Sequence, residues 1–240
     1  MSADLVLLPG WGLGRGPWRA TAQALGGRIL DLPGYGEQAL ETDFRAAADA
    51  LAAQLVPGTT LCAWSLGAML ALTIAVRAPE RVERLVLVSG TASFVQRPGW
   101  PNALAPEALA GFAAAASADV EALLPRFVGN FNRGDAAGKA LTRELLALAD
   151  PRPATTTLAT GLSWLRDVDL RPLAPRVTAP TLLLHGAVDP LMPLAAAQAL
   201  AQLSPGSRLH PFAGRAHAPF LSEPESFRAT LAAFCLDTPT

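Results

Sequence analysis

Short apolar runs that end at a glycine, a proline or a polar turn recur along the chain and predict the strands of a sheet. The six runs are DLVLLPG, RILDLPGYG, TTLCAW, ERLVLVSG, APTLLLHG and SRLHPF. Between them, apolar residues at helical spacing predict helices over Trp18–Leu25, Phe44–Leu55, Leu66–Arg77, Leu194–Leu203 and Ser226–Phe234. Strands that alternate with helices indicate an α/β fold, with a mostly parallel sheet covered by helices on both faces.

One stretch interrupts this alternation. From about residue 100 to residue 165 the chain has no strand pattern, and the segments APEALAGFAAAASADVEALLPRFVGNF and GKALTRELLALAD are typical of helices. The chain returns to the sheet near residues 170–181. We therefore expect a core in two parts, residues 1–99 and 169–240, with a helical cap inserted between them as residues 100–168.

Composition narrows the class of protein. The 240 residues are 51% hydrophobic and 16% charged, which allows one large domain with a sizeable core. The formal net charge of −1 gives no indication of a nucleic-acid or membrane partner. The longest apolar run, residues 61–76, is too short to span a bilayer and is interrupted by Ser65 and Gly67. No basic segment precedes the first strand, and Cys62 and Cys235 lie in apolar runs, so we expect a cytoplasmic protein with free thiols.

A serine stands in the otherwise apolar run LCAWSLGAML, between a predicted strand and a predicted helix. The local pattern Ala63-Trp64-Ser65-Leu66-Gly67 is small-x-Ser-x-small, a variant of the nucleophile elbow. At such a sharp turn the strand and helix backbones come close together, so only small residues fit two positions before and after the serine. The alternative is a serine that only caps the helix.

A serine nucleophile needs a base, and histidine is the usual one. His217 lies in a predicted loop between the sixth strand and the last helix, where catalytic groups of α/β sheets collect. His210 and His185 fall within strand patterns, and we interpret them as structural. The three histidines show no metal-ligand spacing, and no metal or redox cofactor is implied.

The base in turn needs an acid that orients it. Asp189 follows the fifth strand and is the preferred candidate, although it would also serve as a turn or helix-cap residue. Asp167 and Asp169, at the edge of the insertion, are less favoured. The order Ser65, Asp189, His217 is the one expected in α/β-hydrolases.

The loop after the first strand, LLPGWGLG, predicts a second part of the site. Gly10 and Gly12 allow its backbone to approach the serine. We expect the amides of Trp11 and Leu66 to be the oxyanion donors, the second at the positive end of the helix that follows Ser65.

With these parts placed, the sequence resembles the α/β-hydrolase superfamily over essentially its full length. Within it, the chain is similar to the pimeloyl-[acyl-carrier protein] methyl ester esterases of bacterial biotin synthesis. The segments that carry this resemblance are LVLLPGWGL, DLPGYG, WSLGAMLALTIAVRAPERVERLVLV, VDLR, GAVDPLMP and AHAPFLSEPESF.

The resemblance implies hydrolysis of a methyl ester at the end of a pimeloyl chain borne by an acidic acyl-carrier protein. Ser65 would be the nucleophile, His217 the base and Asp189 the orienting acid. Trp11 and Leu66 would contact both the oxyanion and the substrate. The acyl chain would also meet the cap residues Phe127, Val128, Gly129, Asn130 and Phe131, and the carrier would meet Arg126, Arg133, Lys139 and Arg143. These four cations are alternatively a solvated helix face. We expect a monomer.

Two positions depart from the family pattern. Pro9 stands where a histidine often precedes the Gly-Trp-Gly turn, and Ala63 stands where the elbow usually has glycine. Neither change removes a reacting group. The cap is the least similar part, and a cap sets substrate choice.

Other functions remain open at this point. A generic short-chain carboxylesterase or a C–C-bond hydrolase would carry the same triad. A non-catalytic binding protein on this fold would not need all three of Ser65, Asp189 and His217. Haloalkane or epoxide chemistry would need an aspartate nucleophile at position 65, which is serine.

Overall fold

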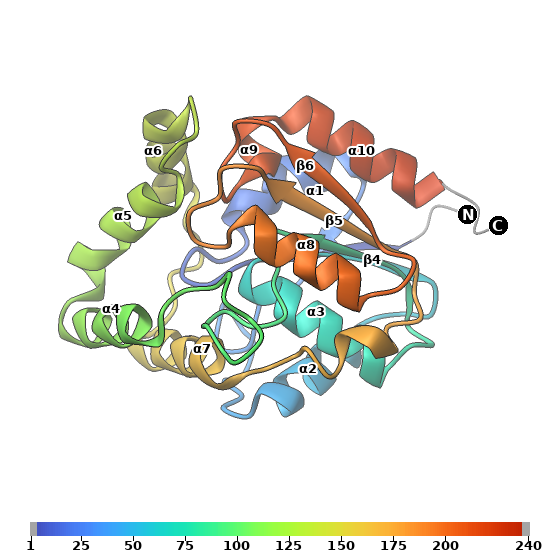
Figure 1. The fold of residues 1–240 in the computed structure, drawn as a ribbon, viewed down its shortest axis with the longest axis horizontal. Helices are drawn as coiled ribbons and strands as arrows, with labels where there is room; N and C mark the ends of the chain where they lie inside the picture. The colour runs from blue at the N-terminus through green and yellow to red at the C-terminus, as the bar shows by residue number, and fades with distance from the viewer. Residues whose placement is uncertain (1–3, 237–240) are drawn as a thin grey trace.

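A six-stranded sheet forms the centre of the molecule, which a computed structural model describes over residues 4–236. The strand order is β2-β1-β3-β4-β5-β6, and every neighbouring pair is parallel (Figure 1). The strands are β1 (Leu5–Leu8), β2 (Arg28–Ile29), β3 (Thr59–Trp64), β4 (Val82–Val88), β5 (Thr181–Gly186) and β6 (Arg208–Phe212). The predicted α/β class with a parallel sheet is confirmed.

Side chains of the central strands alternate between two buried clusters, one on each face of the sheet. In β1, Val6 and Leu8 join one cluster while Leu5 and Leu7 join the other. Successive side chains of a strand point to opposite faces, so a continuous apolar strand must be covered on both sides. The first face is covered by α2 (Phe44–Ala52), α3 (Leu66–Arg77) and α8 (Leu194–Leu203), the second by η1 (Gly16–Trp18), α1 (Arg19–Leu25), α9 (Pro219–Ser222) and α10 (Pro224–Leu236).

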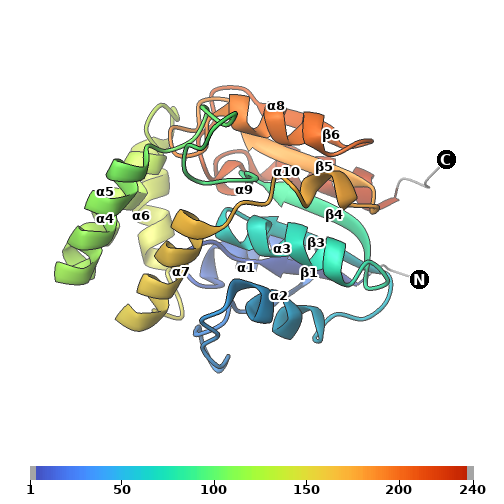
Figure 2. The same cartoon turned by 60° about the horizontal axis from the view of Figure 1, so that its bottom comes forward.

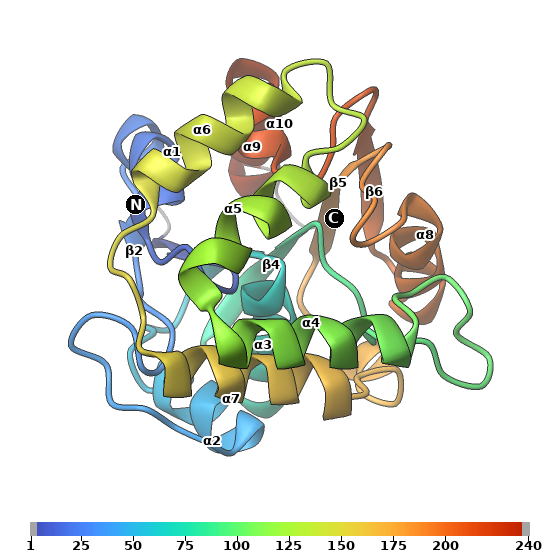
Figure 3. The ribbon, with the colours of Figure 1, turned by 90° about the vertical axis from the view of Figure 1, so that its left-hand side faces the viewer.

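The cap consists of four helices between β4 and β5. They are α4 (Pro106–Ala118), α5 (Val120–Phe131), α6 (Gly138–Leu148) and α7 (Thr155–Asp167). They lie to one side of the sheet, away from the described ends of the chain (Figures 1 and 2). Seen from the cap side, α4 and α7 run next to each other (Figure 3).

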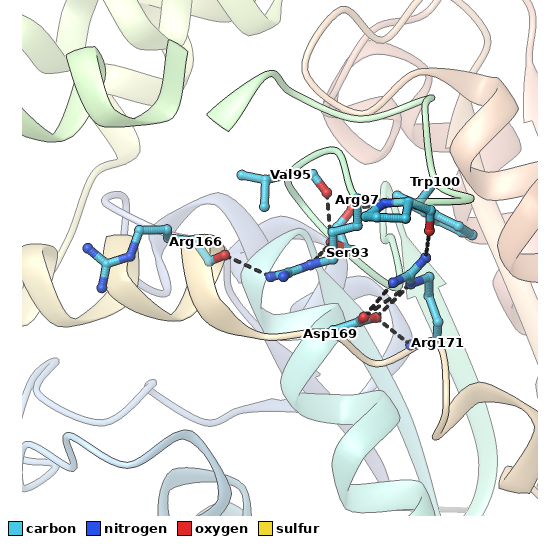
Figure 4. Close-up of polar contacts among 8 residues, drawn as sticks. Ser93, Val95, Arg97, Trp100, Arg166, Asp169 and Arg171 are labelled. Carbon is cyan, nitrogen blue, oxygen red and sulfur yellow. Dashed lines mark hydrogen bonds and ion pairs between the residues drawn. The ribbon is translucent and has the colours of Figure 1, made fainter. Parts of the chain in front are cut away.

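Hydrogen bonds fix the cap to the core at the two places where the chain passes between them. Arg97 donates to Ser93 Oγ at 2.9 Å and to the Arg166 carbonyl at 2.8 Å. Arg171 binds the Asp169 carboxylate, and its Nη1 donates to the Pro98 carbonyl at 2.6 Å (Figure 4). This network joins the loop after β4 to the end of α7 and to the segment that follows it.

The carboxylates of the two less favoured acid candidates are paired with arginines in this region. Asp169 is paired with Arg171, and hydrogen bonds from that guanidinium hold the pKa of Asp169 below its usual value. Asp167 is paired with Arg166. In the described part of the chain, no helix is long and apolar enough to cross a membrane.

Candidate active site

Ser65 occupies the turn between β3 and α3 in a strained backbone conformation, with φ 57° and ψ −119°. A positive φ is uncommon for a residue other than glycine, and such strain collects at functional sites. The close approach of helix to strand explains the small residue at position 67, because a Cβ on Gly67 would collide with the Pro9 carbonyl oxygen. Ala63 is fully buried in β3, so the methyl group that replaces the usual glycine is accommodated.

The three candidate triad side chains meet although they are far apart in the sequence. His217 Nε2 lies 3.0 Å from Ser65 Oγ, and His217 Nδ1 lies 2.7 Å from Asp189 Oδ2. All three residues are buried. A carboxylate on one ring nitrogen and a hydroxyl near the other fix the imidazole in the orientation that a general base for Ser65 requires.

Asp189 is held by the loop that follows β5. Its Oδ1 accepts hydrogen bonds from the amides of Leu191 and Met192 at 2.9 and 3.0 Å, which leaves Oδ2 for His217. The histidine loop packs directly on the end of β5, and a Cβ on Gly186 would collide with the Ala216 carbonyl oxygen. A larger residue at 186 would therefore separate the acid from the base.

The loop after β1 lies against Ser65. A Cβ on Gly10 would be 3.2 Å from the Cβ of Ser65, so this backbone is in contact with the elbow. The amide of Gly12 donates to the hydroxyl of Tyr35 at 2.8 Å, which fixes the far side of the loop. Leu66 is the first residue of α3, so its amide belongs to the positive end of that helix. The amides of Trp11 and Leu66 remain the predicted oxyanion donors.

An apolar cavity of about 280 Å³ lies between the core and the cap. The Trp11 indole forms part of its wall; its Nε1 donates to the Leu158 carbonyl of α7 at 2.9 Å, and its ring meets Phe112 and Phe127 edge-on. Phe131, whose ring centroid is 5.1 Å from that of His217, connects the cavity to the triad. The cavity is lined by Trp11, Phe94, Leu104, Ala108, Leu109, Phe112, Phe127, Asn130, Phe131, Arg133, Leu162, Leu165, Pro190 and Leu191.

Three of the five predicted acyl-contact residues line this cavity, and two do not. Phe127, Asn130 and Phe131 lie on it, whereas Val128 is buried in the cluster that contains Leu145 and Gly129 lines a separate groove. The correction follows from helix geometry, because consecutive residues of α5 point in different directions. Residues of α4 and α7 also line the cavity and were not predicted from the sequence. For α7 the signal was the helical spacing of the apolar residues Leu162 and Leu165.

The similarity of this chain to known proteins extends over nearly its whole length. A model of the alpha/beta hydrolase family matches residues 5–230. The chain belongs to the alpha/beta hydrolase family. A pimeloyl-[acyl-carrier protein] methyl ester esterase of Aromatoleum aromaticum is 42% identical over 236 residues, which cover 92% of this hydrolase and 94% of that protein. The enzyme of the same name from Edwardsiella ictaluri is 35% identical and covers 96% of this chain and 92% of its own.

Solved structures agree with this assignment. An esterase from Exiguobacterium antarcticum superposes with a TM-score of 0.87 at 25% identity, over 98% of this hydrolase and 93% of that chain. The resemblance to the alpha/beta hydrolases and to their esterase branch, inferred from the sequence motifs, is confirmed.

A second histidine lies beside Asp189 in this hydrolase. His185, at the end of β5, is fully buried; its Nε2 is 2.7 Å from the Met192 carbonyl oxygen and 3.7 Å from Asp189 Oδ2. Burial lowers the pKa of His185, and the nearby Asp189 carboxylate and Met192 carbonyl only partly oppose that effect. His185 is therefore neutral at neutral pH and supports the Asp189 loop through Met192. His210 lies in β6, and its ring packs edge-on against the ring of Phe212.

Three of the four predicted carrier contacts line one groove on the outside of the cap. Arg133, Lys139 and Arg143 are exposed around a hollow of about 670 Å³, and Arg133 also lines the apolar cavity. Arg126 is exposed on α5 but does not line this groove. Within residues 4–236, no cluster of three or more His, Cys, Asp or Glu side chains has the arrangement of a metal site.

Proposed function

We propose that this hydrolase is a serine carboxylesterase that cleaves the methyl ester of a pimeloyl chain carried by an acyl-carrier protein. The observation that carries the proposal is the chain of contacts from Asp189 through His217 to Ser65, with distances of 2.7 and 3.0 Å. The substrate follows from the two esterase relatives, both of which bear that substrate in their names.

The reaction proceeds in two acyl transfers. Ser65 Oγ attacks the ester carbonyl carbon while His217 Nε2 takes its proton, and the oxyanion binds the amides of Trp11 and Leu66. The tetrahedral intermediate collapses, the C–O bond to the methoxy group breaks, and His217 gives its proton to the departing oxygen, so methanol leaves. Water then attacks the acyl-enzyme, with His217 again as base, and releases the free carboxylate and Ser65.

The shape and polarity of the cavity support an aliphatic acyl substrate. Its walls are aromatic and branched apolar side chains, and its polar members are Asn130 and Arg133. The Arg133 guanidinium donates to Asn130 Oδ1 at 2.8 Å. Because Arg133 lines both the cavity and the basic groove, an acyl chain would run from the groove past this residue to Ser65.

The basic groove supports a carrier protein with an acidic surface. Opposite charges on two partners raise the association rate more than the final affinity. We further propose that the enzyme acts as a monomer in the cytoplasm, where its two free cysteines, Cys62 and Cys235, would stay reduced.

Substitution of the nucleophile tests the proposal. Ser65→Ala is expected to abolish hydrolysis of a pimeloyl-[acyl-carrier protein] methyl ester and to leave the fold intact. Ser89→Ala is the matched control, since Ser89 is also buried at a strand end with positive φ. Full activity of Ser65→Ala would refute the mechanism. Turnover that is no better on the pimeloyl ester than on simple aryl esters, together with failure to restore growth to a cell lacking its own pimeloyl ester esterase, would refute the substrate.

A further inference from the structure

A buried carboxylate lies in the turn between α5 and α6 of the cap. The side chain of Asp135 is 1% exposed, although it belongs to a surface turn. Its Oδ1 accepts from the amide of Ala137 at 2.9 Å, which closes the turn. Burial of a charged carboxylate is costly unless both of its oxygens accept hydrogen bonds. The second oxygen, Oδ2, therefore also needs a donor.

The second oxygen of Asp135 reaches out of the cap to the histidine loop. Oδ2 accepts from the amide of Ala216 at 3.1 Å, and Ala216 immediately precedes His217. The Arg215 guanidinium is farther, with Nη1 3.8 Å from Oδ1, and its Nε is already bound to Glu223 at 2.9 Å. The contact with the Ala216 amide is therefore the more direct one.

The backbone around His217 is held from two sides. The cap holds two consecutive amides, that of Ala216 through Asp135 and that of His217 through the Phe131 carbonyl at 3.4 Å. The core holds the His217 carbonyl through Trp64 Nε1 at 2.8 Å. The contact with Asp135 is shorter than that with Phe131, and it is charge-assisted, so it is the stronger of the two cap contacts.

We propose that Asp135 is a positioning residue for the catalytic base, through which the cap sets the place of His217 relative to Ser65. The inference rests on the proposed serine mechanism. Loss of the contact frees the loop, lengthens the path from Nε2 to Oγ and slows acylation, while the cavity that binds the acyl chain keeps its walls. Small misplacements of reacting groups are sufficient to cost roughly 10²-fold in rate.

The test compares Asp135→Ala and Asp135→Asn with the unchanged enzyme on a small aryl acetate ester, which needs no carrier. Asp135→Ala is expected to lower kcat roughly 10–100-fold with little change in KM, and to slow the labelling of Ser65 by an aryl phosphonate equally. Asp135→Asn keeps one oxygen that can accept a hydrogen bond, so it is expected to recover part of kcat. A loss of folded enzyme would reduce the final amount of Ser65 that the phosphonate labels, whereas a positioning role lowers only the rate of that labelling.

Asp119→Ala is the matched control. Asp119 is also a cap aspartate that accepts from a backbone amide, that of Ala122 at 3.0 Å, but it is the N-cap of α5, at the opposite end of that helix from the turn that holds Asp135. It is expected to keep kcat. Unchanged kcat in folded Asp135→Ala, or equal losses in both alanine variants, would overturn the inference; if Asp135→Ala does not fold, unchanged kcat in Asp135→Asn overturns it.

Ser65→Ala, measured in parallel, separates the two proposals. If Ser65→Ala is active, the serine mechanism fails. If Ser65→Ala is inactive and both Asp135 variants are fully active, only the positioning role fails.

Discussion

Trp64 Nε1 donates a hydrogen bond to the carbonyl oxygen of His217 at 2.8 Å. Trp64 immediately precedes the nucleophile, so the same residue fixes the elbow and the backbone of the base. Its ring also lies 5.6 Å from the His217 imidazole, centroid to centroid, and 5.1 Å from the ring of Phe220. The nucleophile and the base are thus connected through the core as well as through their own side chains.

This relationship predicts that Trp64→Phe loses activity out of proportion to stability. Phenylalanine keeps most of the ring packing but leaves the His217 carbonyl without its donor, which costs about 1–3 kcal/mol of unfolding free energy. Because the carbonyl belongs to the base, kcat on an aryl ester is expected to fall roughly tenfold or more. Steady-state kinetics and denaturant unfolding measure the two effects.

Trp18→Phe is the control for that prediction. Trp18 is also fully buried, and its Nε1 donates to the Leu8 carbonyl at 2.9 Å and not to the backbone of His217. It is expected to lose similar stability and to keep kcat. Equal kcat losses in the two variants would contradict a specific role of Trp64.

The buried His185 predicts that stability falls at mildly acidic pH. Its ordinary pKa is 6.5, and burial lowers it in the folded protein. Below about pH 6.5 the unfolded chain therefore binds a proton that the folded chain does not, so this group destabilises the fold as pH falls. His185→Gln keeps an N–H donor for the Met192 carbonyl but cannot titrate.

Denaturant unfolding at about pH 8 and about pH 5.5 checks this difference. The unchanged protein is expected to lose roughly 1 kcal/mol more than His185→Gln between the two conditions. The other titratable groups are the same in both proteins, so their contributions cancel in the comparison. Equal losses would show that His185 is not the group responsible.

Because Phe127 lines the cavity, we expect acyl-chain selectivity to depend on Phe127 and not on the adjacent Val128. Phe127 lines the cavity and packs edge-on against Trp11, with ring centroids 5.4 Å apart. Phe127→Ala removes wall surface that only a longer chain touches. The ratio of kcat/KM for a medium-chain methyl ester to that for an acetate ester is expected to fall roughly tenfold or more.

Val128→Ala is expected to change stability and not acyl-chain selectivity. Val128 is fully buried but does not line the cavity. It is expected to lower the free energy of unfolding by about 1–3 kcal/mol and to leave the ratio unchanged. A shift of the ratio in Val128→Ala alone would show that the acyl chain lies elsewhere.

Local patterns were sufficient to predict the elements that carry the triad. The predicted helix Leu66–Arg77 agrees with α3 at both ends, because the elbow and the apolar run are both local signals. The helix expected over 44–55 ends at Ala52, since the amides of Gln54 and Leu55 form single turns to Leu51 and Ala52. The order of serine, acid and histidine indicated the three residues that the structure brings together.

Elements fixed by distant contacts were harder to predict. No separate helix was predicted for α7, which begins with three threonines and is attached to the core by Trp11 Nε1 and by the hydrogen bond from Trp164 to the Thr42 carbonyl. Threonine is a poor helix former on its own. The role of Asp135 likewise depends on Ala216, which is 81 positions away, and no spacing rule connects them.

Reversal of the charges that line the groove is expected to lower activity on the carrier-borne substrate and not on a small ester. Lys139→Glu with Arg143→Glu reverses two exposed cations that line the groove. An acidic partner would then be repelled, so kcat/KM on the pimeloyl-carrier ester should fall roughly 10-fold or more at low salt, less at high salt, because salt screens exposed charges. Activity on an aryl acetate should stay unchanged. Arg126→Glu changes a cation off the groove and should have a smaller effect; an equal effect would show that general charge, not this groove, attracts the carrier.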